Sequence, residues 1–415
     1  MANISELILS APHEDAEGSA LPEILSAIRQ HLRMDVAFVS EFKEGRRVYR
    51  SVDAADGSSK VREGASDPLG ASYCQRVVDG RLPPIMHDAR KNPEAASLPI
   101  SDELHIAAHL AVPLRLSDGS IYGTLCAFSY SEDDTLNERD LEMMQVFAEL
   151  AARMIEREQR KIRLSRDALK RIHSVLAHAN ELSIVYQPIF NLREQRMAGV
   201  EALSRFSALP QRSPDVWFHE ASVVGLGGDL EKMAAQAALR CLDQLPQDIY
   251  LSVNMSPEYV LDGTLATVLE GMPLHRVTLE ITEHSAIVAY HELAQRLKPL
   301  RERGLQVAID DAGAGYASFR HILNLAPERI KLDISITKNI DSDASRRALG
   351  AAFSRFAQEI GSKLIAEGVE TREELATLQS LGVVRAQGNF LSAALPLAGV
   401  LSLPVKRAFS RPGQT

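Results

Sequence analysis

The stretch Val307-Ala308-Ile309-Asp310-Asp311-Ala312-Gly313-Ala314-Gly315-Tyr316 leads two adjacent carboxylates from an apolar run into a glycine-rich loop. Neighbouring side chains on a strand point to opposite faces, so both Asp residues serve one site only where the strand gives way to the loop. Gly313 and Gly315 permit a turn there. Adjacent carboxylates repel each other unless a cation or a shared proton offsets their charge. The stretch alone fits either a divalent-metal site or a solvated Asp-Asp turn, and the rest of the C-terminal half decides between them.

The length and composition of the chain predict two or three globular domains. Its 415 residues are 45% hydrophobic, which is enough to build cores. The formal net charge is -9 and there is no basic block, so a nucleic acid polymer is not expected as a partner. A small anionic ligand is still compatible with this charge, provided that metal ions or a few Arg and Lys residues bind it locally.

The cysteines and the apolar segments bear on the compartment. Cys74, Cys126 and Cys241 are widely spaced and form no CxxC pair, which favours a reducing compartment. The chain does not open like a signal peptide, and it has no apolar run of about 18 residues. We therefore expect a cytoplasmic protein without a membrane segment.

The N-terminal half has the pattern of a small α/β domain. Apolar residues recur at helical spacing over residues 21–32, and a strand pattern follows over 36–42. Lys43-Glu44-Gly45 indicates a hairpin turn before a second strand. Two more strands, 111–116 and 120–128, are joined by Asp118-Gly119, a strong hairpin signal.

This order of elements, with VPL before the last turn and YGTLCAF after it, resembles a GAF domain over residues 15–157. The segment 72–89, SYCQRVVDGRLPPIMHDA, resembles a GAF variant. GAF domains are sensory modules that bind cyclic nucleotides, haem, bilins, other small molecules or nothing visible, so the resemblance leaves the ligand unknown. The Asn-Lys-Phe-Asp-Glu pattern of cyclic-nucleotide binders is not evident. The irregular spacing of Cys74, His87, His105 and His109 favours ordinary structural roles over a metal or haem set.

A long helix is expected to connect the two halves over residues 136–170. Thr135 to Asp140 carry N-cap residue types, and Leu141, Met144 and Ala148 begin an apolar stripe. A charged run over 156–161 interrupts this stripe. The helix is either a solvated spacer or a segment that pairs with a second copy of the chain.

In the C-terminal half, apolar runs alternate with helix-patterned stretches, as in repeated βα units. Eight runs are predicted as strands: 183–189, 197–203, 249–255, 277–281, 305–310, 329–334, 363–367 and 384–390. Polar residues stand at or near the C-terminal ends of seven of them: Glu201, Asn254, Glu280, Asp310 with Asp311, Lys331 with Asp333, Glu367 and Gln387.

Eight strands predict a TIM-like (β/α)8 barrel, in which the strand ends converge on one mouth. Burying that many carboxylates without cations costs several kcal/mol for each uncompensated ion. We therefore expect two divalent metal ions to compensate the charge of these carboxylates. Oxygen ligands suit Mg²⁺ or Mn²⁺, and the set holds no Cys or His to select zinc.

The same residues resemble the EAL domain, the bacterial phosphodiesterase of cyclic di-GMP, over residues 170–405. The motifs, in order, are Gln187-Pro188, Glu201-Ala202-Leu203 with Arg205, Asn254-Met255-Ser256-Pro257, Glu280-Ile281-Thr282-Glu283, Asp310-Asp311, Lys331-Leu332-Asp333, Glu367-Gly368-Val369-Glu370 and Gln387-Gly388. The resemblance implies hydrolysis of cyclic di-GMP to linear pGpG with two metals.

The resemblance also implies residue roles. The metal ligands would be Glu201, Asn254, Glu280, Asp310, Asp311 and Glu367. Lys331 joins Glu201 and Asp310 as catalytic residues, and Lys331 and Gln387 position the attacking water. Substrate contacts would be Gln187, Leu203, Arg205, Asp333, Glu370 and Gln387, and Glu283 would anchor the loop after Asp311. Near two metals we expect Lys331 to have a depressed pKa, whether it acts as a base or as an electrostatic stabiliser.

Departures from the EAL pattern, at Ala312, Ala314, Asn389 and Ala394, remove no metal ligand. The alternatives are a receptor that binds cyclic di-GMP without cutting it and a barrel hydrolase of another phosphodiester. Gly227-Gly228-Asp229-Leu230 mimics a GGDEF synthesis motif only superficially. We further expect a homodimer in which the GAF domain sets the activity through the helix over 141–164 and the loop over 312–319.

Overall fold

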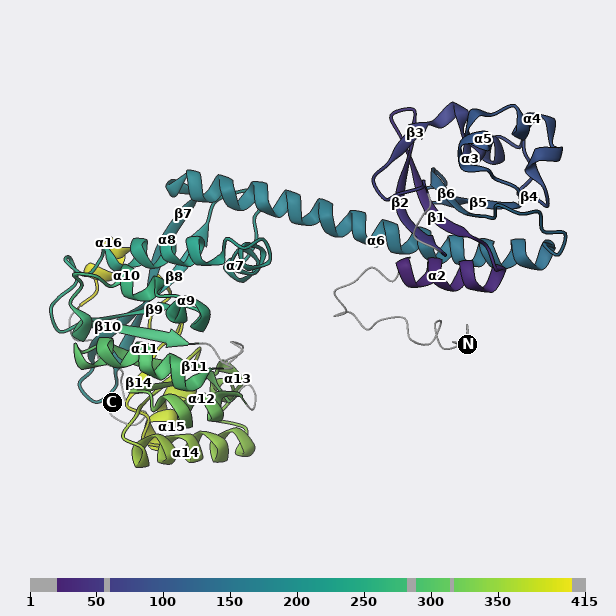
Figure 1. Cartoon of the computed structure of the whole chain (residues 1–415). Helices are drawn as coiled ribbons and strands as arrows, with labels where there is room; N and C mark the ends of the chain where they lie inside the picture. The colour runs from purple at the N-terminus through teal and green to yellow at the C-terminus, as the bar shows by residue number, and fades with distance from the viewer. Residues whose placement is uncertain (1–20, 56–59, 282–288, 314–316, 405–415) are drawn as a thin grey trace. The chain divides into compact units, whose positions relative to one another are not determined.

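The computed structural model describes residues 21–55, 60–281, 289–313 and 317–404 (Figure 1). The chain divides into two compact units, Met1–Leu164 and Ser165–Thr415. Each unit has its own hydrophobic core and is described by itself.

The N-terminal unit is built on a six-stranded antiparallel sheet with the order β3-β2-β1-β6-β5-β4. Its strands are β1 (Val36–Lys43), β2 (Arg46–Ala54), β3 (Ser66–Pro68), β4 (Ile85–Met86), β5 (His109–Arg115) and β6 (Ile121–Phe128). The two predicted hairpins are confirmed. Gly45 and Gly119 take the positive φ that these tight turns require, at 72° and 83°.

Helices cover both faces of this sheet (Figure 1). One face carries α2 (Leu21–Leu32) and the first part of α6 (Glu138–Ala177), and Ala37 and Val39 of β1 point into that core. The other face carries α3 (Tyr73–Val78), α4 (Pro93–Ala96) and α5 (Pro99–Leu104), with the turns η1 (Leu69–Ala71) and η2 (Ala89–Lys91). Val36 and Phe38 point to this second face, as the period-two alternation of a strand requires.

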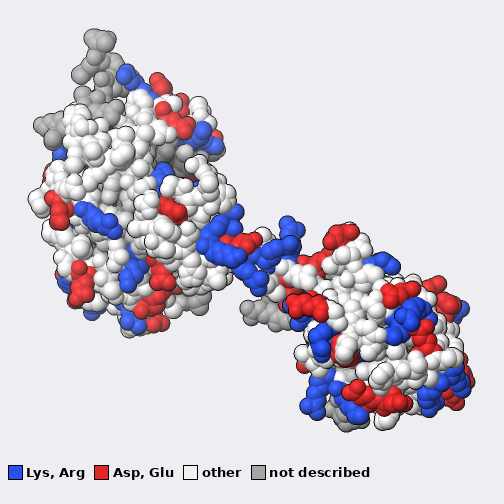
Figure 2. Space-filling model, turned by 90° about the horizontal axis from the view of Figure 1, so that it is seen from above, with Lys and Arg blue, Asp and Glu red and all other residues white. Residues whose placement is uncertain are grey.

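The long connecting helix is confirmed as α6, which has 40 residues. Leu141, Met144 and Ala148 are buried in the N-terminal unit, whereas Ile172 and Val175 pack against Trp217 in the C-terminal unit. Residues 157–164 between them are exposed. Figure 2 shows basic side chains gathered around this part of the chain, and mixed charges over the visible face of each unit. Both the spacer and the pairing interpretation require this exposure in a single chain.

The C-terminal unit is a closed barrel with the strand order β10-β11-β12-β13-β14-β7-β8-β9. Its strands are β7 (Leu182–Asn191), β8 (Arg196–Phe206), β9 (Tyr250–Asn254), β10 (Val277–Ile281), β11 (Gln306–Ala312), β12 (Arg329–Leu332), β13 (Lys363–Ala366) and β14 (Arg385–Ala386). The helical segments around it are η3 (Ala179–Glu181), α7 (Pro214–Val223), α8 (Gly227–Leu239), α9 (Pro257–Leu261), α10 (Thr264–Val268), η4 (Leu274–Arg276), α11 (Tyr290–Glu302), α12 (Ala317–Leu325), α13 (Ile334–Thr337), α14 (Ala344–Glu359), α15 (Arg372–Ser380) and α16 (Leu397–Leu401).

One strand departs from the all-parallel pattern of repeated βα units. β7 runs antiparallel to both of its neighbours, β8 and β14. Only the turn over residues 192–195 separates β7 from β8, and a parallel connection needs a crossover of a dozen or more residues. The predicted barrel is therefore confirmed, with a hairpin at its start.

Among the described residues, no helix combines the length and the apolar character needed to span a membrane.

Candidate active site

Charged and amide side chains from six barrel strands meet at one end of the barrel. Glu201, Glu280 and Lys331 lie within β8, β10 and β12 and are buried. Asp310 and Asp311 lie near the end of β11, while Glu367 and Gln387 directly follow β13 and β14. Burial of so many ionisable groups is tolerated only where they neutralise one another or bind a cation.

A bulge in β11 brings both members of the Asp pair to the same site. The register with β12 shifts between Ile309 and Ala312, which inserts an extra residue at the pair. Asp311 has a φ of 53°, and Asp tolerates this left-handed conformation better than most residues. Gly313 follows with a φ of 107°, and a Cβ at this position would lie 2.2 Å from Ile336 Cδ1. Backbone geometry here, more than strand alternation, sets the direction of the carboxylates.

Lys331 is the hub of the site. Its side chain is 1% exposed, and its Nζ lies within ion-pair distance of four carboxylates. These distances are 3.2 Å to Glu201 Oε2, 2.9 Å to Glu280 Oε2, 2.9 Å to Asp310 Oδ1 and 2.8 Å to Glu367 Oε1. A single ammonium therefore links side chains from four different strand ends.

Gln387 makes a second bridge across the same group. Its Nε2 donates hydrogen bonds to Glu201 Oε2 at 2.6 Å and to Glu367 Oε1 at 2.8 Å. The amide thus fixes the spacing of these two carboxylates without adding charge.

The carboxylates fall into two groups with the spacing of metal ligands. Glu201, Glu280 and Asp310 offer oxygens within 4.8 Å of one another, and so do Asp310, Asp311 and Glu367. Asp310 belongs to both groups. Glu280 Oε1 is buried without a hydrogen-bond partner among the described residues. Such an unpaired carboxylate oxygen fits a ligand position for a hard divalent cation.

Burial and mutual repulsion change the proton affinity of these groups. Burial raises the pKa of Glu280 to about 8, even though Lys331 acts in the opposite direction. Burial also raises the pKa of Glu367 well above its usual range. Desolvation would lower the pKa of Lys331, but the charges of Asp310, Glu201, Glu280 and Glu367 outweigh it and raise the pKa well above the ordinary value. The expected depressed pKa of Lys331 is therefore corrected for this structure, because that expectation assumed divalent cations beside the ammonium.

The raised pKa of Glu280 predicts that the folded protein loses stability as this carboxylate ionises at higher pH. A Gln substitution removes that loss. Between the ordinary value of 4.5 and about 8, the folded protein binds this proton and the unfolded chain does not. Stability therefore falls as pH rises, by at most about 1.4 kcal/mol per pH unit for one proton. With EDTA present, we expect Glu280→Gln to stabilise the protein relative to wild type more at pH 8 than at pH 5.

The measurement is the thermal unfolding midpoint of both proteins at the two pH values. A difference in unfolding midpoint between the two proteins that is the same at pH 5 and pH 8 would contradict the raised pKa of Glu280. Saturating Mg²⁺ should remove the pH dependence, because a bound cation takes the place of the proton.

A cavity of about 430 Å³ opens beside the carboxylates. Of the predicted site residues, those lining it are Leu203, Arg205, Asn254, Glu280, Asp310 and Asp311. The Arg205 side chain is exposed, and its Nη1 donates to the carbonyl oxygen of Ser204 at 2.8 Å. Arg205 thus keeps further donors for an anionic group on the solvent side of the cavity.

Residues 166–394, more than half of the 415-residue chain, match the EAL domain family. The chain belongs to the EAL domain family. Residues 16–156 match the GAF domain, in agreement with the N-terminal sheet.

Two relatives are similar to the EAL half of the chain. The probable cyclic di-GMP phosphodiesterase PdeD of Escherichia coli is 31% identical over 52% of this chain and 42% of PdeD. The cyclic di-GMP phosphodiesterase PdeB of Shewanella oneidensis is 30% identical over 53% of this chain and 27% of PdeB. The chain thus spans less than half of the length of either relative.

Two solved structures share the EAL fold. The PaMucR phosphodiesterase in complex with c-di-GMP is 25% identical, with a TM-score of 0.51, over 56% of this chain and 99% of that one. The EAL enzyme Bd1971, in its cAMP and cyclic di-GMP bound form, is 18% identical, with a TM-score of 0.53, over 89% of this chain and 92% of that one. The second similarity supports the fold alone.

Three described residues that were predicted as substrate contacts do not join this group. Gln187 pairs with Glu201 across β7 and β8 but does not line the cavity. Asp333 caps α13 by accepting from Ser335 N at 2.9 Å. Glu370 forms an ion pair with Lys338 at 3.4 Å. Glu283 lies outside the described residues, as do Ala314, Gly315 and Tyr316 of the loop after the Asp pair. Substrate contacts by Gln187, Asp333 and Glu370 stay predictions.

Glu231 of α8 is a cavity residue that the sequence analysis missed. Its carboxylate accepts from Ser256 N at 2.7 Å and from Ser256 Oγ at 2.5 Å. Burial raises its pKa. Ser256 follows Asn254 by two residues, so Glu231 fixes the segment that carries a predicted metal ligand. The available signal in the sequence was Ser256 of the Asn-Met-Ser-Pro motif, because its hydroxyl and backbone N–H both need a hydrogen-bond acceptor.

We expect Glu231→Gln to destabilise the EAL domain by about 1–2 kcal/mol, because the amide cannot accept both hydrogen bonds from Ser256. The cyclic di-GMP hydrolysis that the EAL resemblance implies should slow roughly tenfold, because Asn254 loses its fixed position. Urea unfolding and initial rates measure the two effects. Glu258→Gln is the matched control, since Glu258 is exposed on the neighbouring helix α9. Equal behaviour of the two variants would contradict this role for Glu231.

Proposed function

We propose that this protein hydrolyses cyclic di-GMP to linear pGpG with two divalent cations, Mg²⁺ or Mn²⁺. The observation that carries the proposal is the pair of carboxylate groups that share Asp310. Supporting it are membership of the EAL family and the relatives named as cyclic di-GMP phosphodiesterases.

The charge of the site supports two cations. Among the described residues, the two groups contain Glu201, Glu280, Asp310, Asp311 and Glu367, and the ammonium of Lys331 forms ion pairs with Glu201, Glu280, Asp310 and Glu367. When all five carboxylates are ionised, four negative charges remain, which equals the charge of two divalent ions. Burial raises the pKa values of Glu280 and Glu367, so their ionised forms are costly unless positive charge compensates them.

The residues present fit that role. Glu201, Glu280 and Asp310 would hold one cation, and Asp310, Asp311 and Glu367 the other, with Asn254 as a further oxygen ligand at the cavity. When bound, two such ions supply Lewis-acid activation of water and of the phosphoryl oxygens. Asp310, shared by both groups, sets the spacing between the two positions.

The side chains of the protein would orient the attacking water and the substrate. Water adds to one phosphodiester phosphorus, one P–O bond breaks, and the opened product keeps a phosphomonoester. Lys331 and Gln387 hold Glu201 and Glu367 from the barrel interior and would orient the attacking water. Arg205 would contact a phosphate of the substrate from the opposite, exposed side of the cavity, as Arg does with bidentate hydrogen bonds.

The second candidate is a receptor that binds cyclic di-GMP without cutting it. The described residues keep every predicted metal ligand and Lys331, which favours the enzyme. The deciding experiment incubates the purified full-length protein with cyclic di-GMP and Mg²⁺ or Mn²⁺ and resolves the products by chromatography. Formation of pGpG supports the enzyme, whereas tight binding without pGpG in either metal establishes the receptor.

We also propose that the protein is a homodimer in which the GAF domain regulates the EAL domain through α6. The supporting observation is that one continuous helix contributes to the cores of both units. A bias of about 1–3 kcal/mol toward the active arrangement changes the rate roughly 5- to 150-fold. We therefore expect the full-length protein and a fragment of residues 165–415 to differ in the rate of cyclic di-GMP hydrolysis and in oligomeric state, which light scattering measures.

That fragment keeps Ile172 and Val175, which pack on Trp217. Equal rates and equal oligomeric states of the two proteins would contradict the regulatory role.

A further inference from the structure

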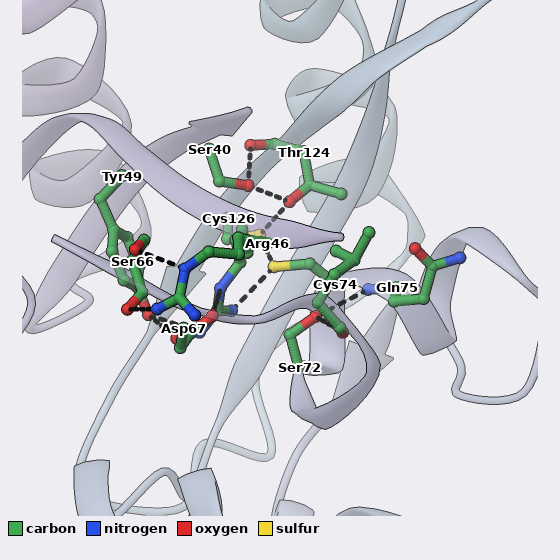
Figure 3. Close-up of polar contacts among 12 residues, drawn as sticks. Ser40, Arg46, Tyr49, Ser66, Asp67, Ser72, Cys74, Gln75, Thr124 and Cys126 are labelled. Carbon is green, nitrogen blue, oxygen red and sulfur yellow. Dashed lines mark hydrogen bonds and ion pairs between the residues drawn. The ribbon is translucent and has the colours of Figure 1, made fainter. Parts of the chain in front are cut away.

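A buried sulfur pair lies in the core of the GAF domain, far from the EAL chemistry in sequence (Figure 3). Cys74 of α3 and Cys126 of β6 are both 0% exposed, and their Sγ atoms are 3.4 Å apart. Their separation of 52 residues hides this proximity in the sequence. Both are free thiols in the structure.

An arginine that is itself buried approaches one sulfur only. Arg47 of β2 is 3% exposed, and its Nη1 donates to Cys74 Sγ at 3.1 Å. Its other nitrogens are held by Asp67, with Nε to Oδ1 at 3.0 Å and Nη2 to Oδ2 at 2.5 Å, and by the hydroxyl of Tyr49. The guanidinium is therefore fixed in position by neighbours other than Cys74.

The second sulfur has polar neighbours of a different kind. Cys126 Sγ lies 3.1 Å from Thr124 Oγ1, which in turn lies 2.9 Å from Ser40 Oγ (Figure 3). Of the two sulfurs, Cys74 Sγ is the one that accepts the hydrogen bond from Arg47, whereas the Thr124 hydroxyl and the charge of Arg47 act on both. This asymmetry assigns different roles to the two thiols.

The proton affinities follow the same division. Burial would raise the pKa of Cys74, but the hydrogen bond from Cys126 and the charge of Arg47 outweigh it and lower the pKa to about 5. Burial, together with the neighbouring Cys74, raises the pKa of Cys126 well above its usual range. The opposite directions of these two shifts match the roles of an attacking cysteine, Cys74, and a resolving cysteine, Cys126.

We propose that Cys74 and Cys126 form a modification site that small hydroperoxides oxidise reversibly to a disulfide. The Cys74 thiolate attacks the terminal peroxide oxygen, so that an S–O bond forms while the O–O bond breaks. The departing alkoxide or hydroxide takes up a proton. Cys126 then attacks the Cys74 sulfur, an S–S bond forms, and the S–O oxygen leaves as water with the proton of Cys126. The two sulfurs lose two electrons, which reduce the peroxide to an alcohol or to water.

Burial selects the size of the oxidant. Both sulfurs lie beneath the packed face of the sheet with Phe38, Tyr73 and Phe128. Hydrogen peroxide is close to water in size, so it needs a smaller local opening of this core than a bulky disulfide reagent does. Oxidation also removes the thiolate that faces Arg47, which leaves Asp67 and Tyr49 as the partners of its guanidinium.

The chain contains its own control thiol. Cys241 is 1% exposed and lies in the barrel unit. Burial raises its pKa to about 11 despite a hydrogen bond with Tyr186. Cys241 matches the pair in burial but lacks the partner sulfur and the guanidinium at hydrogen-bond distance.

The test treats reduced full-length protein with hydrogen peroxide, blocks the remaining thiols under denaturing conditions and maps the peptides by mass spectrometry without reduction. We expect a cross-linked Cys74–Cys126 peptide pair, lighter by two hydrogen atoms than the sum of the reduced peptides, and a fully blocked Cys241. A thiol reductant should restore both free thiols. Absence of the cross-linked pair, or oxidation of Cys241 at the same rate as Cys74, would overturn the proposal.

Two variants separate the roles of the sulfurs. In Cys126→Ser, oxidation should stop at the sulfenic acid of Cys74, which dimedone traps when it is added together with denaturant. In Cys74→Ser, we expect at least a tenfold lower dimedone adduct, located at Cys126. Equal adducts in the two variants would contradict the assignment of Cys74 as the attacking group, and the wild-type peptide map decides the proposal even where a variant fails to fold.

Discussion

We expect Asp310→Asn to lower the rate of cyclic di-GMP hydrolysis by at least about a thousandfold, because the substitution weakens both cation positions at once. Asn retains the size of Asp and one oxygen, so the bulge in β11 should persist. The other carboxylates belong to one ligand group each, whereas Asp310 belongs to both. The measurement is the initial rate of pGpG formation at saturating Mg²⁺.

The matched control for this prediction is Asp248→Asn. Asp248 carries the same charge, but its side chain is 65% exposed and pairs with Arg196. The control should retain the wild-type rate. A loss of less than about tenfold in Asp310→Asn would show that the shared carboxylate is not what organises the site.

Lys331→Met should produce the largest loss of stability. Met keeps much of the length of Lys but removes the ammonium, so Glu201, Glu280, Asp310 and Glu367 lose their shared ion-pair partner. Removing one partner from a buried ionic group costs about 3–5 kcal/mol. We expect that loss in EDTA and a distinctly smaller loss in Mg²⁺, because bound cations replace part of the missing charge. In Mg²⁺, where the wild type turns over, the rate should fall at least about a hundredfold.

Thermal unfolding with and without Mg²⁺ measures this effect. Lys338→Met is the control, because Lys338 is half-exposed and pairs only with Glu370 at 3.4 Å among the described contacts. If Mg²⁺ does not narrow the difference between Lys331→Met and wild type, the ammonium and the cations do not share the same carboxylates.

Much of the barrel could be predicted because its strands are buried apolar runs of regular length. The direction of β7 could not be predicted from run counting alone, since a run has the same pattern in either direction. The available signal was the short separation between the predicted strands 183–189 and 197–203, which leaves no room for a crossover helix.

The Asp pair shows how far the site could be predicted. The residues indicated that both carboxylates serve one site, and the structure adds the cause, a bulge with Asp311 at a φ of 53°. Glu231 was missed because in the sequence it lies within a helix, whereas the other predicted site residues stand at or near the ends of strands. The pairing of Cys74 with Cys126 was missed because contacts between distant segments leave no local pattern.

The most direct test of the two-cation account measures pGpG formation against the number of Mn²⁺ ions bound per protein. The full-length protein is first freed of metal by exhaustive chelation, and Mn²⁺ is then added stepwise while bound metal and rate are recorded. The account predicts no turnover without metal and full turnover only as the second ion binds. Full turnover in the chelated protein, or with a single bound ion, would contradict it.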